Sequence, residues 1–136
     1  MTQEDKELLL RDLCARLPYE TRVRYTYAFA GVVGINEYSD EGTLSYDKLQ
    51  DFSLPNVGYE RRRVVCILPY LRPMSSMTEE EKISVQALAF ANDAILIFDW
   101  LHSHHFDCRG LIQKGLAIAV TEENNPYKNE SYDKKR

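Results

Sequence analysis

The spacing of the apolar residues changes near residue 20, and this change constrains the fold more than any other feature of the chain. Leu9, Leu13 and Leu17 recur at helical spacing, and Pro18 ends that pattern. Over residues 21–29, apolar and polar side chains alternate, which is typical of a half-buried β-strand. A helix followed directly by strands, with helical segments nearer the C-terminus, predicts the α+β class.

We expect an N-terminal helix, a small antiparallel sheet of three or four strands, and a C-terminal helical layer packed on that sheet. The predicted strand segments, in chain order, are residues 21–29, 32–38, 43–46 and 61–68. The predicted connections are a turn at 30–31, a polar turn at 39–42 and a segment that is mostly loop over 47–59. We expect Pro69 to end the last strand, because proline cannot donate to a ladder.

Capping residues mark the helix starts. Thr2 precedes the first helix, which is expected to be about 13 residues long. Thr78 and Glu81 have the spacing of a capping box ahead of a second helical segment. Asp93 can cap a further helix that runs to about His104, so we interpret this segment as two helices rather than one.

The residues after 104 are expected to close the domain. Asp107 can cap a short turn over 108–114, and Gly115 suits the left-handed position that ends such a turn. Residues 116–120 are expected to be extended. The polar segment 121–136 has no apolar period, which predicts a mobile tail. We therefore expect a single α+β domain over 1–120 and a polar tail over 121–136.

Composition limits the function. The chain has 136 residues and a formal net charge of −4, which argues against bulk binding to nucleic acid. Cys14, Cys66 and Cys108 are far apart and form no CxxC pair, so neither a disulfide framework nor a zinc knuckle is expected. Reduced thiols and an acidic N-terminal segment, unlike a signal peptide, predict a cytoplasmic location.

The segment Ala87–Leu101 is apolar on nearly all sides of the predicted helices. Such helices are usually buried on both sides or used in a partner interface. The acids Asp93 and Asp99 interrupt the segment, so we expect no membrane span. We predict a homodimer formed through this region.

Three histidines and a cysteine lie close together in the sequence. His104 and Cys108 are four residues apart, a spacing that suits a metal site, and Cys108 with His104 or His105 is a candidate nucleophilic pair. His102 and His105 can instead cover the last turn of a helix, where positive charge is favourable. We favour the helix-end and packing roles, so no catalytic residue, metal ligand or cofactor is predicted.

Basic residues on the strands offer a ligand site. If neighbouring strands carry them, several guanidinium groups gather on one sheet face, and their planar forks match phosphate or carboxylate. Nearby tyrosines can stack on a base. The alternative for the strand arginines is a solvated face on which they pair with acids. The alternative for Tyr70 and Arg72, which lie between two prolines, is a fixed bridge between sheet and helix. The predicted ligand-binding residues are Arg22, Arg24, Arg61, Arg63, Tyr70 and Arg72.

Three blocks of sequence resemble a family of small uncharacterised proteins of gut Bacteroides-type bacteria and their phages and mobile elements. The blocks are LCARLPY, PYLRPMSSMTEEEK and DWLHSHHFDCRGLIQKGLAI. The resemblance implies a phage or mobile-element accessory protein rather than a metabolic enzyme, and it implies no known activity. The middle of the chain, residues 20–59, departs from the family pattern and is a candidate partner-facing part.

Three functions follow as hypotheses. The first is a non-enzymatic accessory or interaction protein with an unknown protein partner. The second is a protein that binds or sequesters a small anionic ligand such as a nucleotide signal. The third is an enzyme that uses Cys108 and a histidine, which requires an exposed thiol about 3–4 Å from a histidine nitrogen.

Overall fold

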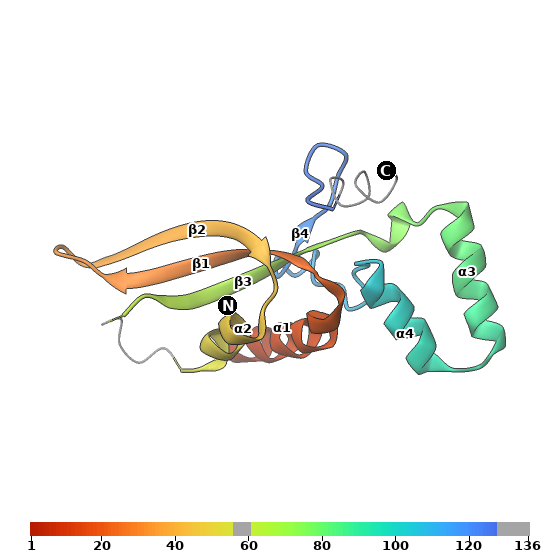
Figure 1. The fold of residues 1–136 in the computed structure, drawn as a ribbon, viewed down its shortest axis with the longest axis horizontal. Coiled ribbons are helices and arrows are strands. Elements are labelled where there is room, and N and C mark those ends of the chain that lie inside the picture. The colour runs from red at the N-terminus through yellow and green to blue at the C-terminus, as the bar shows by residue number, and fades with distance from the viewer. Residues whose placement is uncertain (56–60, 128–136) are drawn as a thin grey trace. The chain divides into compact units, whose positions relative to one another are not determined.

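The computed structural model describes residues 1–55 and 61–127 and confirms the α+β class (Figure 1). The elements are α1 (Gln3–Arg16), β1 (Arg22–Ala30), β2 (Ile35–Thr43), α2 (Tyr46–Ser53), β3 (Arg63–Leu71), α3 (Glu79–Phe90), α4 (Ala94–Ser103) and β4 (Ile118–Ala119), with 3-10 turns at Leu17–Tyr19 and Met74–Ser76. The chain divides into two compact units, Met1–Tyr70 and Leu71–Arg136. The single cooperative domain expected over 1–120 stays a prediction.

The first unit begins with the predicted helix. The Thr2 hydroxyl accepts the Asp5 amide at 3.0 Å, and the Asp5 carboxylate accepts the Thr2 amide, so α1 has a full capping box. Leu9 and Leu13 are buried, as the apolar spacing predicts. Local capping and one apolar face are therefore enough to place this helix.

The sheet of the first unit has β1 at its centre, antiparallel to β2 on one side and to β3 on the other. Helices α1 and α2 lie on one side of this sheet (Figure 1). Val23, Tyr25 and Ile67 of the sheet are buried together with Leu9 and Leu13 of α1. The predicted hairpin is confirmed, and so is the alternation of β1 from Arg22 to Tyr27. It breaks after that, because Ala28 is buried and Phe29 is half-buried.

The second arm of the hairpin differs from the prediction. Gly31 donates to the Gly34 carbonyl at 2.7 Å, so residues 32–34 belong to the turn. Gly34 has φ +74°, a conformation that glycine adopts without strain. The polar turn predicted at 39–42 is wrong, because these residues pair with β1 and extend β2. Backbone pairing with a neighbouring strand overrides their weak strand propensity.

The loop predicted over 47–59 is wrong for its first part, where α2 forms. Leu49 and Phe52, spaced three apart, are the buried residues of this helix. Residues 56–60 lie outside the described residues. The end of β3 also differs, because the strand continues through Pro69 to Leu71. Proline is tolerated in a strand where the ladder does not need its nitrogen as a donor.

The second unit contains the two helices that the sequence predicts. The Thr78 hydroxyl accepts the Glu81 amide at 3.2 Å and the Glu81 carboxylate accepts the Thr78 amide at 2.9 Å. The Asp93 carboxylate accepts the Ile95 amide at 3.0 Å and starts α4. Asn92 has φ +56°, which breaks the helical path between α3 and α4. The capping predictions at Thr78 and Asp93 are confirmed.

The turn after α4 also follows the prediction. The Asp107 carboxylate accepts the amides of Leu111 at 2.8 Å and Ile112 at 3.0 Å. Gly115 has φ +74°, and Leu116 donates to the Leu111 carbonyl at 2.9 Å, which is the closing pattern of a helical turn. The short β4 follows. Within this unit the backbone amide of Val120 donates to the carbonyl of Leu71 at 2.8 Å.

The start of the predicted polar tail is folded back in a turn. Thr121 and Asn124 exchange backbone hydrogen bonds at 3.3 and 3.2 Å. The Tyr127 ring stacks on His105 with centroids 3.8 Å apart. Residues 128–136, the rest of that tail, lie outside the described residues. In the part of the chain that is described, no helix has the length and apolar character to cross a bilayer.

Candidate functional site

Arg22 and Arg24 of β1 point away from the side of the strand that carries Tyr25. Arg22 donates to the Thr43 hydroxyl at 2.7 Å. Arg24 donates to Glu41 at 3.0 Å and to the Tyr70 hydroxyl at 3.1 Å. The hydrogen bond with Glu41 raises the pKa of Arg24. The pairing of Arg24 with Glu41 fits the alternative of a solvated face whose arginines pair with acids.

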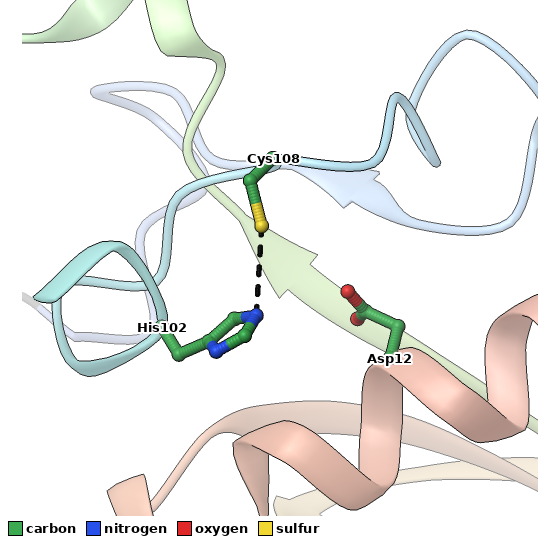
Figure 2. A group of neighbouring side chains, drawn as sticks. All are labelled: Asp12, His102 and Cys108. Atoms are coloured by element: carbon green, nitrogen blue, oxygen red, sulfur yellow. Dashed lines mark hydrogen bonds between the residues drawn. The ribbon is translucent and has the colours of Figure 1, made fainter. Parts of the chain in front are cut away.

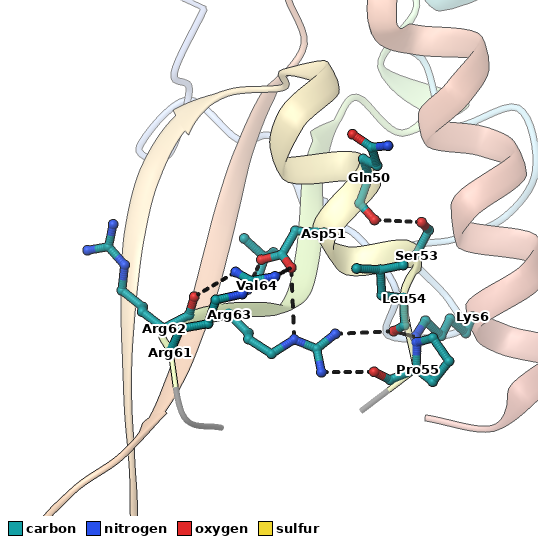
Figure 3. Close-up of polar contacts among 10 residues, drawn as sticks. All are labelled: Lys6, Gln50, Asp51, Ser53, Leu54, Pro55, Arg61, Arg62, Arg63 and Val64. Carbon is teal, nitrogen blue, oxygen red and sulfur yellow. Dashed lines mark hydrogen bonds and ion pairs between the residues drawn. The ribbon is translucent and has the colours of Figure 1, made fainter. Parts of the chain in front are cut away.

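Arg61 and Arg63 instead meet at Asp51 of α2 (Figure 3). The Asp51 carboxylate accepts Arg61 at 3.1 Å, lies 3.8 Å from the Arg63 Nε, and accepts the Val64 amide at 2.8 Å. Arg63 is 5% exposed and also donates to the Pro55 carbonyl at 2.8 Å. Arg63 therefore joins the end of α2 to the start of β3. The four arginines that the sequence predicts as ligand-binding in this unit do not gather on one sheet face.

Arg72 belongs to the second unit. Its guanidinium makes two 2.7 Å hydrogen bonds to Glu81 and lies 4.1 Å above the Phe106 ring centroid. The paired guanidinium lowers the pKa of Glu81 from 4.5 to about 2. This geometry matches a fixed bridge to α3. Ligand binding by the six predicted residues stays a prediction.

A different group of cations surrounds a hollow in the first unit. The hollow has a volume of about 420 Å³. Its wall is formed by residues of α2, among them Lys48, and by Tyr27, Arg61, Arg62 and Val64. Lys48 donates to the Tyr27 hydroxyl at 2.8 Å, and this hydrogen bond raises the pKa of Lys48. Arg62 donates to the Tyr38 hydroxyl at 2.6 Å and lies 5.1 Å from the Tyr27 ring centroid.

The sequence analysis did not select Lys48, Arg62 or Tyr38 for this site. Lys48 lies in a segment predicted as loop, and Arg62 falls on the opposite strand face from Arg61 because successive side chains of a strand alternate. Recognising α2 from the spacing of Leu49 and Phe52 would have set Lys48 beside the sheet. The pairing of Tyr27 with Tyr38 depends on the β1–β2 register, which the misplaced turn obscured.

Cys108 has a histidine partner in the second unit, but it is His102 rather than His104 or His105. Its Sγ lies 3.5 Å from His102 Nε2 (Figure 2). Arg109 Nη1 lies 3.2 Å from the same nitrogen. Because a guanidinium is always a donor, His102 Nε2 acts as an acceptor toward Arg109. The thiol is half-buried and His102 is buried. An enzyme that uses Cys108 stays a prediction.

The other two histidines have helix-end roles. His104 is the C-cap of α4; its Nδ1 lies 2.9 Å from the Trp100 carbonyl, and its ring stacks on Trp100 with centroids 3.9 Å apart. His105 has φ +64°, and its carbonyl accepts the Arg72 amide at 2.7 Å. These contacts place His104 and the backbone of His105 at the end of α4, and the predicted absence of a metal site stays a prediction.

Helices α3 and α4 present large apolar side chains to solvent. We call this set the α3–α4 surface; it consists of Ile83, Phe90, Ile95, Leu96 and Phe98. Phe90 is 91% exposed and Ile95 is 72% exposed. None of the residues of α3, all of which the structure describes, is buried. The second unit therefore carries a candidate interaction surface on its helices.

Comparisons with protein-family models, with curated proteins and with solved structures gave no match to this chain. The resemblance to small proteins of Bacteroides-type bacteria and their mobile elements, and the accessory role that it implies, therefore stay predictions.

Proposed function

We propose that this chain is a non-enzymatic interaction protein that self-associates through the α3–α4 surface. The exposure of Phe90 and Ile95 is the observation that carries this proposal. Burying a large apolar side chain is worth about 1.5–3 kcal/mol relative to leaving it in water. Contiguous exposed apolar patches are typical of interaction sites.

The two helices also need a partner for their own stability. Isolated helices of 12 and 10 residues, the lengths of α3 and α4, are marginal in water. Most helical stability in proteins comes from packing of an apolar face, and α3 buries none of its residues. An occupant of the α3–α4 surface would supply that packing.

A second copy of the chain is the occupant that the chemistry of the surface favours. Residues 83–100 contain no lysine or arginine and only two acids, so the surface offers little to a charged partner. Ile83 and Phe90 are seven residues apart, and Ile95 and Phe98 are three apart, which is the spacing of a helical packing seam. Two such hairpins related by a two-fold axis form a four-helix bundle with like apolar faces in contact.

Sedimentation equilibrium of the full chain tests the proposal. We expect a dimer at concentrations from about 1 to 100 µM. The double substitution Phe90→Glu and Ile95→Glu should give a monomer, because both side chains are exposed on the proposed contact surface. The helical far-UV circular dichroism signal should fall with it, because α3 and α4 lose the packing that the partner supplies. Val33→Asp is the matched control, since Val33 is 89% exposed on the hairpin turn of the first unit. It should leave the dimer intact.

A wild-type chain that stays monomeric across this range contradicts the proposal. A dimer that persists in the double variant also contradicts it. The same holds if Val33→Asp dissociates the dimer as fully as the double substitution does.

A further inference from the structure

Two cations of the hollow beside α2, Lys48 and Arg62, form no ion pair with any acid of the described residues. Among residues 1–55 and 61–127, neither Lys48 nor Arg62 has a carboxylate within 4.0 Å. Each donates a hydrogen bond to a tyrosine hydroxyl instead, Lys48 to Tyr27 and Arg62 to Tyr38. Each hydroxyl occupies one donor, so the ammonium group keeps two N–H donors and the guanidinium keeps four.

The remaining charges of the hollow do not cancel this excess. Asp51 and Arg61 both line it, and they pair at 3.1 Å. Asp51 is further balanced by Arg63, whose side chain is 6% exposed (Figure 3). Asp47 is the other acid in the lining. The described lining is therefore positive, as an anion site requires.

An aromatic surface adjoins the cations. The Tyr27 and Tyr38 rings stack with centroids 5.1 Å apart, and Phe29 meets Tyr38 edge-on at 6.2 Å. Phe29, Ala30, Tyr38 and Arg62 line a second hollow of about 460 Å³. Arg62 lies in the walls of both hollows. Tyr38 is 39% exposed, so part of its ring remains open to contact.

We propose that this pair of hollows binds a nucleoside phosphate, with the phosphate between Lys48, Arg61 and Arg62 and the base against Tyr38 and Phe29. Guanidinium groups match phosphate oxygens through paired hydrogen bonds. Base stacking on an aromatic ring is tolerant of sequence and contributes to affinity at each base. The site lies in the first unit and does not depend on self-association through the α3–α4 surface.

The size and charge of the site favour a single nucleotide. Each hollow lies within the range of small-ligand pockets. The net charge of −4 disfavours a long polyanion, whose binding depends on many phosphate contacts. A nucleotide can occupy both hollows, with its phosphate at the cations and its base at the aromatic rings. Inorganic phosphate lacks the base and a nucleoside lacks the charge, so each can occupy only one.

Isothermal titration calorimetry of the full chain with AMP, GMP, inorganic phosphate and adenosine tests the proposal. We expect at least one nucleotide to bind more tightly than both phosphate and adenosine. No nucleotide binding at millimolar concentration overturns the proposal, and so does phosphate binding as tight as that of the nucleotides.

Variants locate the site. Lys48→Gln and Arg62→Gln should each weaken nucleotide binding about tenfold or more, the effect of losing a charge-assisted hydrogen bond. Tyr38→Ala should weaken nucleotide binding and leave inorganic phosphate binding unchanged. Arg11→Gln is the charge-matched control, because Arg11 is exposed on α1 and lines neither hollow. The assignment is wrong if Arg11→Gln weakens nucleotide binding as much as Arg62→Gln does. It is also wrong if Lys48→Gln, Arg62→Gln and Tyr38→Ala all leave nucleotide binding unchanged.

Discussion

Substitution of Glu81 by glutamine tests the ion pair that joins α3 to the segment after β3. Glutamine keeps the capping-box hydrogen bond to the Thr78 amide, because either residue can make it. The substitution removes the charge that faces Arg72, and it replaces one of the two oxygens that accept from Arg72 at 2.7 Å with an amide donor, so one of those hydrogen bonds is lost with the charge. Its effect therefore reports the ion pair and not the helix cap.

The pKa of Glu81 gives the expected size and pH dependence of the effect. Lowering that pKa from 4.5 to about 2 corresponds to about 3 kcal/mol of stabilisation at full strength. Water reaches the half-buried pair and screens it, so we expect a loss of about 1–2 kcal/mol at pH 7. Because the folded pKa is the lower one, the contribution is complete above pH 4.5 and is lost as the pH falls toward 2.

Urea unfolding followed by Trp100 fluorescence measures this effect. Trp100 is the one tryptophan of the chain and lies in α4, so it reports the second unit. The difference between wild type and Glu81→Gln should fall to less than half of its pH 7 value at pH 3. Glu79→Gln is the control: Glu79 is 87% exposed and should change stability by less than about 0.5 kcal/mol at either pH. A Glu81→Gln difference that is absent at pH 7, or equally large at pH 3, refutes the reasoning.

Two further substitutions test local structure. Asp51→Asn leaves the buried Arg63 without its counter-charge and should destabilise the first unit by about 2 kcal/mol or more, measured by urea unfolding with far-UV circular dichroism. A change below about 0.5 kcal/mol would contradict this role. Gly115→Ala should lower the free energy of unfolding, measured by Trp100 fluorescence, by about 1 kcal/mol, because residue 115 has φ +74°, which alanine adopts only with strain. No steric clash adds to this cost, since no described atom lies within 4 Å of the added Cβ. A loss above about 3 kcal/mol would point to a steric clash instead.

Local features were predicted well because their causes are local. Thr2, Thr78 and Asp93 cap helices through hydrogen bonds to amides two or three residues away, so the sequence alone places these helix starts. Gly115 takes the left-handed conformation that its position after a turn predicts. The apolar spacing of α1 and the alternation of β1 likewise need no information from distant residues.

The candidate ligand site was predicted less well, because its geometry depends on register and on a short helix. Arg63 shares an apparent strand face with Arg61 in the sequence, yet it is buried at the end of α2. Lys48 reaches Tyr27 because α2 packs beside β1, and Arg62 reaches Tyr38 because β2 pairs with β1. The contacts of Lys48 with Tyr27 and of Arg62 with Tyr38 each join residues that are more than 20 positions apart.

The sequence by itself determined the α+β class, the helix caps and the apolar character of residues 87–101, because these depend on composition, on spacing and on neighbours within one helical turn. The tertiary structure decided which charges are paired. Arg16, seven residues after Leu9 and so on the same face of α1, is fully buried with Asp12 at 2.7 Å. Arg72 is bound to Glu81, whereas Lys48 and Arg62 contact hydroxyl groups. An ion pair requires two side chains to meet within about 4 Å, and the pairing of strands and the packing of helices set those distances.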